Sequence, residues 1–231
     1  MSNAILNIGI CTVDAVARCV DQFPPPGGLR LFESLTLTTG GCAMNCSLAL
    51  ARMGLSCQII IKVGDDLLGQ FVLEQLGRHR IDQRGVIRAA GQGTAFTFVC
   101  VHPSGQRSFI HTMGTNASLQ LEEIQIDLVR QARFCSVSGA MVMPALDGEP
   151  TAQLLAEAQR SGAITLLDTV YTDTADQATW QAKIHPVLPY LDFFVPSEPE
   201  ARAITGLDAP AEMARYFQAR GCKNVVIKLG S

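Results

Sequence analysis

Four residues near the N-terminus combine side chains and backbone groups that could bind a polyol. Asp14 follows the first apolar strand in ICTVD, where a carboxylate can accept hydrogen bonds from two hydroxyls. Gly40 and Gly41 precede a helix of small residues, whose free N–H groups favour hydroxyl or anionic oxygens. Asn45, in the first turns of this helix, can donate to and accept from a hydroxyl pair. An exposed turn at Asp14 and a plain tight turn at the glycines are the structural alternatives.

Two other groups have the residue types of a catalytic or metal site, but we favour structural interpretations for both. Asp65 and Asp66, in GDDLLG, stand where a helix begins, so we predict that they cap it. Cys42 and Cys46 are four residues apart, but neither a His nor a second Cys pair follows at zinc-site spacing. We predict that the eight cysteines are reduced and fill small core sites.

Short apolar runs alternate with helical patterns along most of the chain. This alternation predicts right-handed βαβ crossovers and a parallel, doubly wound α/β sheet with helices on both faces. The predicted strands cover residues 5–10, 58–64, 134–139, 163–169, 193–197 and 224–230. The predicted helices cover residues 43–53, 68–79, 150–162, 198–206 and 211–221.

Two segments do not follow this alternation. Residues 94–112 alternate with period two around Pro103-Ser104-Gly105, which predicts an antiparallel hairpin. Residues 11–39 contain FPPPGG and no helical period, which predicts extended strands around a loop. We expect these pieces, about 11–39 and 94–113, to form a small discontinuous β lid at the edge of the parallel sheet, within a single domain of residues 1–231.

Two side chains of the predicted hairpin are candidate lid contacts. Thr94, Phe96 and Phe98 are expected to share one face of the outgoing strand, with Phe109 and His111 on a face of the returning strand. One face of the lid must cover the site. We name Phe96 and His111 as candidate substrate contacts, and a surface-packed His111 is the structural alternative.

Composition limits the classes of partner. The 231 residues are 48% apolar and carry a formal net charge of −3 without a basic run, so we expect neither nucleic acid nor an anionic membrane surface as a partner. No apolar stretch approaches the roughly 20 residues that span a bilayer. The N-terminal residues lack the pattern of a signal peptide, which predicts a cytoplasmic protein.

The last predicted strand, in NVVIKLG, is apolar, and no crossover helix or neighbouring strand follows it. A strand of this kind is normally covered on both faces, and an exposed apolar edge promotes aggregation. We therefore expect the sequence to be a C-terminally truncated part of a longer protein, with a partner over the edge as the alternative.

The chain resembles the PfkB, or ribokinase-like, family of carbohydrate kinases along essentially its whole length. The resemblance rests on the order of six features: VD after the first strand, TTGGCAMNCSLALARMG, KVGDDLLGQ, a hairpin leading into GTNASL, VPSEPEARAITG, and VVIKLG. It implies a three-layer α/β/α fold with a β lid, and phosphorylation of a primary hydroxyl of a sugar by ATP with Mg²⁺. In several members the lid pairs with that of another subunit, so a homodimer through the lid is expected.

The resemblance also implies roles for individual residues. It assigns Gly41 and Asn45 to the sugar site and favours Asp14 as a sugar ligand. At the phosphate and nucleotide side it implies Ser197 where the family has Asn, Glu200 acting through magnesium-bound water, and Lys228 with Gly230 bordering ATP. Asp168 is a further candidate on this side because it stands at the carboxyl end of another predicted strand. No direct metal ligand is assigned.

The family's second signature, a G-A-G-D segment, does not occur in these 231 residues. Its Asp is the base that takes the proton from the sugar hydroxyl, and its amides form an anion hole for the transferring phosphoryl group, so we expect the base beyond Ser231 and an inactive 231-residue chain. A nucleoside kinase and a catalytically inactive sugar-binding protein remain the alternatives. A Rossmann dehydrogenase is disfavoured because no G-x-G-x-x-G follows the first strand.

Overall fold

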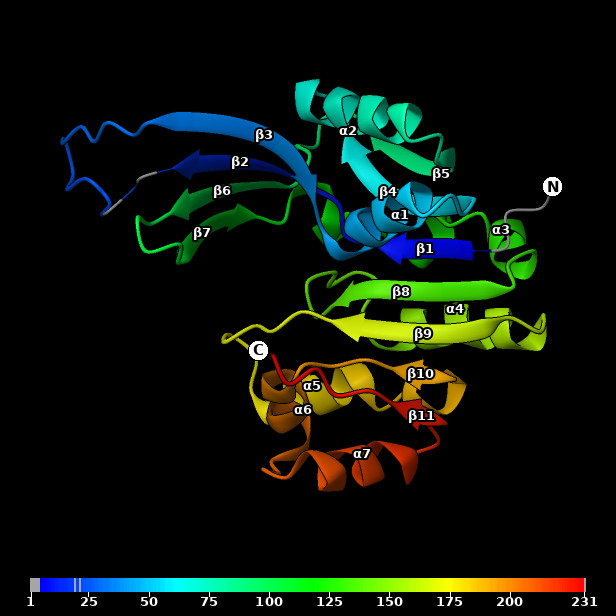
Figure 1. Ribbon diagram of the computed structural model, residues 1–231. Helices are drawn as coiled ribbons and strands as arrows, with labels where there is room; N and C mark the ends of the chain where they lie inside the picture. Colours follow the sequence, from blue (N-terminus) through cyan, green and yellow to red (C-terminus); the bar gives the residue numbers. More distant parts are fainter. Residues whose placement is uncertain (1–4, 19, 21, 231) are drawn as a thin grey trace.

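The computed structural model describes residues 5–18, 20 and 22–230. They form a large sheet, a small sheet and two layers of helices (Figure 1). The strands are β1 Ile5–Gly9, β2 Thr12–Arg18, β3 Ser34–Gly40, β4 Cys57–Gly64, β5 Asp82–Ala89, β6 Phe96–Val101, β7 Arg107–Thr112, β8 Phe134–Ala140, β9 Ile164–Thr169, β10 Phe193–Phe194 and β11 Asn224–Val225. The α-helices are α1 Cys42–Arg52, α2 Leu67–Arg78, α3 Ile126–Arg130, α4 Glu149–Arg160, α5 Gln177–Ile184, α6 Glu198–Thr205 and α7 Pro210–Gln218. Three 3₁₀ turns lie at Gly114–Ser118, Leu121–Glu123 and Leu188–Tyr190.

The large sheet contains seven parallel strands in the order β11-β10-β9-β8-β1-β4-β5. From β1 the chain first adds β4 and β5 on one side and later adds β8 to β11 on the other, so the strand order reverses at β1. In open sheets of this kind, ligands bind at the carboxyl ends of the strands near such a switch point. The α/β class and the parallel sheet predicted from the sequence are confirmed.

Helices cover the two faces of this sheet unequally. Buried residues of α1 and α2 pack with β4 in one core, whereas α3 to α7 pack with β1, β8, β9 and β10 in another. On the α1 side, the sheet near β8, β9 and β10 is open and forms an apolar groove of about 630 Å³. Its lining includes Leu50, Phe134, Ile164, Leu166 and Phe193. Three layers therefore exist, but one is incomplete within the described residues.

The small sheet has the order β3-β2-β6-β7 and extends beyond the edge to which β1, β8 and β9 point (Figure 1). β2 pairs antiparallel with β3 and parallel with β6, and β6 pairs antiparallel with β7. All four strands lie within the two segments that interrupt the strand–helix alternation of the sequence.

Several local details differ from the sequence predictions. The last two predicted strands have only two sheet residues each, although a bridge between Ser197 and Lys228 continues their alignment. β5 and α5 were not predicted. Asp66 caps α2 as predicted, because its side chain accepts from Gly69 N; the prediction for Asp65 is wrong, since it forms an ion pair with Arg88 instead.

The cysteine prediction holds for most of the described thiols. Cys11, Cys57, Cys100, Cys135 and Cys222 are free and buried, and Cys19 lies outside the described residues. Cys42 is only partly buried, and Cys46 is exposed and lines the apolar groove, so Cys46 does not fill a core site as predicted.

Candidate functional site

The first part of the candidate site forms where the chain passes from the large sheet into the small sheet. Asp14 lies in β2, and Thr12 Oγ1 donates to its Oδ1 at 2.7 Å. Gly40, at the end of β3, is paired with Thr12, and a side chain at this position would collide with the Asp14 carboxylate. Gly40 therefore leaves room for the Asp14 carboxylate beside the helix that follows.

At Gly41, the backbone of another segment leaves no space for a side chain. The φ of Gly41 is +89°, and a Cβ there would lie 2.5 Å from the Ile10 carbonyl oxygen and 2.8 Å from Cys11 Cα. The backbone between β1 and β2 thus occupies the place of a side chain. Gly41 is also the N-cap residue of α1, and Asn45 is exposed in the first turn of the helix, where its backbone N–H donates to Gly41 O.

A polar row crosses the small sheet at the level of Asp14. Register pairs Asp14 with Thr38 on one side and Thr97 on the other, and Thr97 with His111. Directly paired residues share a face of the sheet, so the four side chains lie on one face. Thr97 Oγ1 and His111 Nδ1 are 3.0 Å apart. Partial burial lowers the pKa of His111 below its usual value, and the charge of Asp14 opposes this shift.

The structure separates the two candidate lid contacts. Phe96 pairs with Val13 and Thr112, which places it one residue out of step with Asp14 and on the opposite face of the small sheet. It packs against the core formed by α1, α2 and β4. His111 therefore shares the face of Asp14, whereas Phe96 belongs to the packing behind it.

A second group of charged residues gathers at the carboxyl ends of β9 to β11. Lys228 Nζ lies 2.5 Å from Asp168 Oδ1, and the two side chains are 45% and 20% exposed. Asp168 also faces Cys42 in the first turn of α1. Burial, together with the charge of Asp168 and a hydrogen bond to it, raises the pKa of the Cys42 thiol to about 12. The residues predicted for the sugar side and the phosphate side therefore meet around the N-terminus of α1.

Glu200 lies behind this ion pair and is 6% exposed. Its Oε2 accepts from Thr169 Oγ1 at 2.8 Å and from Ser197 N at 2.7 Å, and the Ser197 side chain completes a capping box at the start of α6. Ser197 and Glu200 thus hold the end of β9 to the start of α6. No group of three or more His, Cys, Asp or Glu side chains in the described residues could hold a metal ion.

The end of the described chain runs beside this capping box. Lys228 N donates to Pro196 O and Glu198 N donates to Lys228 O, each at 2.9 Å. Gly230 follows with a φ of +78° and open space around its missing side chain. The main chain of Lys228 is therefore fixed against the start of α6, while its side chain reaches Asp168.

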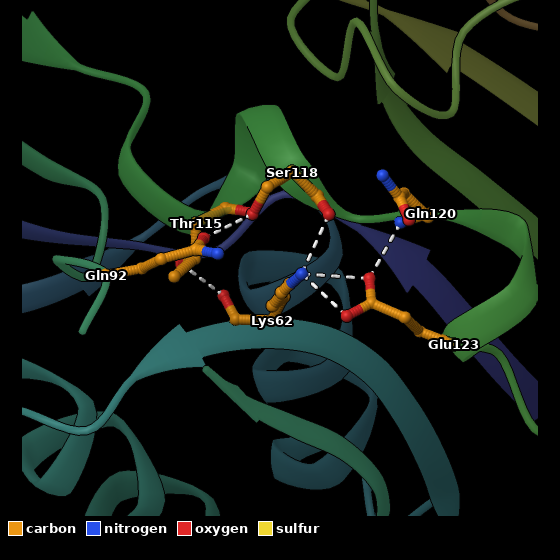
Figure 2. Close-up of polar contacts among 6 residues, drawn as sticks. All are labelled: Lys62, Gln92, Thr115, Ser118, Gln120 and Glu123. Carbon is orange, nitrogen blue, oxygen red and sulfur yellow. Dashed lines mark hydrogen bonds and ion pairs between the residues drawn. The ribbon is translucent and has the colours of Figure 1, made fainter. Parts of the chain in front are cut away.

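A partly buried ion pair that the sequence analysis did not assign joins β4 to the 3₁₀ turns that follow β7 (Figure 2). Lys62, in β4, is 5% exposed; its Nζ donates to Ser118 O at 2.8 Å and to the Glu123 carboxylate at 2.6 and 2.9 Å. Thr115 Oγ1 donates to Lys62 O at 2.7 Å. The signal in the sequence was a lysine inside the apolar run QIIIKVG, but its partners are 56 and 61 residues away.

The fold defines a three-layer α/β protein with a small β-sheet that extends beyond the edge to which β1, β8 and β9 point. Residues 2–231 match the model of the pfkB family carbohydrate kinases, and the chain belongs to this family. No described helix is long and apolar enough to cross a membrane.

Known proteins similar to the chain are sugar kinases by name. It is 27% identical over 238 residues to the ribokinase of Staphylococcus aureus (strain COL), covering all of this chain and 74% of the relative. It is 27% identical over 212 residues to the 2-dehydro-3-deoxygluconokinase of Bacillus subtilis (strain 168), covering 88% and 65%. The structure of Arabidopsis thaliana ribokinase with ribose and ATP matches with a TM-score of 0.85 at 20% identity, covering 100% and 73%. The chain thus spans about two thirds to three quarters of these relatives.

Proposed function

We propose that the protein containing this chain transfers a phosphoryl group from ATP to a primary hydroxyl of a sugar or sugar-like compound. The observation that carries the proposal is the convergence of two groups around the N-terminus of α1. Asp14, Gly41 and Asn45 lie on one side, and Asp168 with Lys228 lies on the other. Phosphoryl transfer depends chiefly on positioning two substrates and stabilising charge, which a crevice between two such groups can provide.

On the sugar side, Asp14 is the proposed principal ligand. Its carboxylate accepts hydroxyl hydrogen bonds, while Asn45 donates and accepts from α1. His111 lies on the same face as Asp14, where its ring can hydrogen-bond a hydroxyl. Gly40 acts by leaving space for the carboxylate, and Phe96 is not carried into the proposed site because it lies on the other face.

On the phosphate side, Lys228 is the proposed cation for the nucleotide phosphates. An approaching phosphate would compete with Asp168 for its ammonium group. Magnesium would arrive with the ATP phosphates and retain several of its waters, so no side chain of this chain is assigned as a direct ligand. Glu200 and Ser197 act by holding the end of β9 and the backbone of Lys228 in place.

The experiment is an ADP-release assay of the whole protein against a panel of sugars, sugar acids and nucleosides. We expect release with at least one sugar or sugar acid, the class that the relatives' names indicate. Release with nucleosides alone would make the protein a nucleoside kinase, and no release with any compound, despite measurable sugar binding, would make it an inactive binding protein. The 231-residue chain, assayed in parallel, is expected to release no ADP.

We further propose that the small sheet pairs with that of a second copy. It exposes large apolar side chains, among them Leu35, Leu37 and Ile110, which are 48–55% exposed. Sedimentation of the whole protein should give a dimer, and Leu37→Ser with Ile110→Ser should give a monomer. A wild-type protein that sediments as a monomer at micromolar concentration contradicts this proposal.

A further inference from the structure

In the segment that joins the two sheets, the backbone N–H and carbonyl of one residue both hydrogen-bond to a side chain that is distant in the sequence. Cys11 lies between β1 and β2, and its side chain is fully buried. Its N–H donates to Asn116 Oδ1 at 3.2 Å, and its carbonyl accepts from Asn116 Nδ2 at 3.0 Å. One amide side chain therefore replaces both hydrogen bonds that a neighbouring strand would provide.

Asn116 is itself held firmly. It is 2% exposed and lies in the 3₁₀ turn that follows β7, with its backbone N–H donating to Met113 O. The preceding Thr115 donates from its backbone to Gly93 O and from its hydroxyl to Lys62 O. At the other end of this turn, Lys62 Nζ donates to Ser118 O and pairs with the Glu123 carboxylate (Figure 2).

The backbone that Asn116 binds, at Cys11, leads directly into the strand that carries Asp14. Cys11 is three residues before Asp14, and the missing side chain of Gly41 is what allows Ile10 and Cys11 to approach α1. The crossing at Ile10 and Cys11 is thus enclosed between Gly41 on one side and Asn116 on the other. A shift of this crossing would move Asp14 relative to the N-terminus of α1.

We propose that Asn116 is the positioning residue of the sugar site, because its amide fixes the Cys11 backbone and thereby the place of Asp14 beside α1. This inference rests on the proposed sugar-kinase function for its kinetic consequence. Asn116 does not itself contact the substrate. It sets the affinity for the sugar and leaves the nucleotide side of the crevice unchanged.

The test compares Asn116→Ala with Thr165→Val in the whole protein. Thr165 is also fully buried, and its hydroxyl bonds to Tyr190 O and accepts from Asp192 N, at the amino end of β9 away from the crevice. We expect Asn116→Ala to raise the sugar KM about tenfold or more, because small displacements of substrate ligands are costly. The ATP KM should change by less than about twofold, and Thr165→Val should change neither value.

Asn116→Asp supplies a second variant that retains the shape of the side chain. In its acid form the new side chain can accept from Cys11 N and donate to Cys11 O, whereas the ionised form faces that carbonyl with a negative charge. Burial raises the pKa of such an acid. The ratio of the sugar KM of this variant to that of wild type should therefore fall as the pH is lowered from about 8 to about 5.5.

Hydrogen exchange separates failure of this inference from failure of the proposed function. Asn116→Ala should speed exchange of the amides in 10–18 without affecting those in 134–140, whether or not a sugar substrate is found. Unchanged exchange in 10–18, or equal changes in the sugar and ATP KM values, would overturn the inference. A wild-type protein that phosphorylates no sugar would overturn the function alone and leave the exchange result to decide the role of Asn116.

Discussion

The two groups of the candidate site, the proposed sugar half at β1–β3 and the proposed phosphate half at β9–β11, are fixed by different kinds of contact. In the β1–β3 half, the backbone of Gly41 packs against that of Ile10 and Cys11. The buried side-chain amide of Asn116 hydrogen-bonds the Cys11 N–H and carbonyl. In the β9–β11 half, two strands have only two sheet residues each, and a partly exposed ion pair links Lys228 to Asp168.

This difference indicates which changes each half can tolerate. A shape set by backbone contacts has few alternatives, because a displaced buried N–H or carbonyl loses its partner. A shape set by exposed side chains can reorganise and replace lost contacts with water. We therefore expect substitutions that add atoms at the backbone contact of the sugar half to disturb the fold itself, and most substitutions in the phosphate half to disturb only charge.

Two glycines with a positive φ, +89° at Gly41 and +78° at Gly230, give the largest contrast. Gly41→Ala should lower the unfolding free energy by about 3 kcal/mol or more, because the new Cβ meets the Ile10 carbonyl and φ is positive. Gly230→Ala has the same kind of φ but open space, so its cost should be about 1 kcal/mol. Urea unfolding of both variants measures this difference. Equal costs would remove the close approach at Gly41 as the distinguishing feature.

Substitution of Glu200, in the phosphate half, should lower the stability of the fold, as expected for the backbone contacts of the sugar half. Glu200→Ala leaves Ser197 N and Thr169 Oγ1 without their buried acceptor, and we expect a loss of about 2–3 kcal/mol in unfolding free energy. Glu198→Ala, which removes an ion pair with Arg202 on the surface of the same helix, should cost less than about 1 kcal/mol. If the two variants unfold at the same urea concentration, the capping role assigned to Glu200 is wrong.

Lys228→Ala should have the smallest effect on stability. The ion pair is partly exposed, so its loss should change the unfolding free energy by less than about 1 kcal/mol. The ATP KM of the whole protein should nevertheless rise about tenfold, which corresponds to the loss of one charge-assisted contact. The sugar KM provides the internal control, and a rise in the sugar KM of the same size would contradict a role confined to the nucleotide side.

Local patterns in the sequence were sufficient for much of this architecture. The glycine pair before a small-residue helix predicts α1, and period-two alternation predicts the hairpin of β6 and β7. β5 was missed because its charged residues hide the strand pattern, and α5 because Trp180 and Ile184 are its only buried residues, too few to mark one apolar face. Local periodicity thus identifies elements only where one side is consistently apolar.

The site required information that sequence neighbours do not contain. Asn116 and Cys11 are 105 residues apart, and Lys62 and Glu123 are 61 apart. The choice between Phe96 and His111 depends on strand register, which alternation alone leaves open by one residue. Asp14 could be named from its place after the first predicted strand and Asp168 from its place at a strand end, although Asp14 lies inside β2. The contacts that hold the two residues could not be named from the sequence.

The most direct test of the account is the kinetics of Asp14→Asn in the whole protein with its best sugar substrate. Asp65→Asn is the matched control, because Asp65 is exposed and pairs with Arg88 of β5, an edge strand of the large sheet. We predict that Asp14→Asn lowers kcat/KM for the sugar about a hundredfold while the ATP KM stays within about twofold, and that Asp65→Asn resembles wild type. An Asp14→Asn protein with wild-type kcat/KM for the sugar would contradict the central claim that this carboxylate binds the substrate.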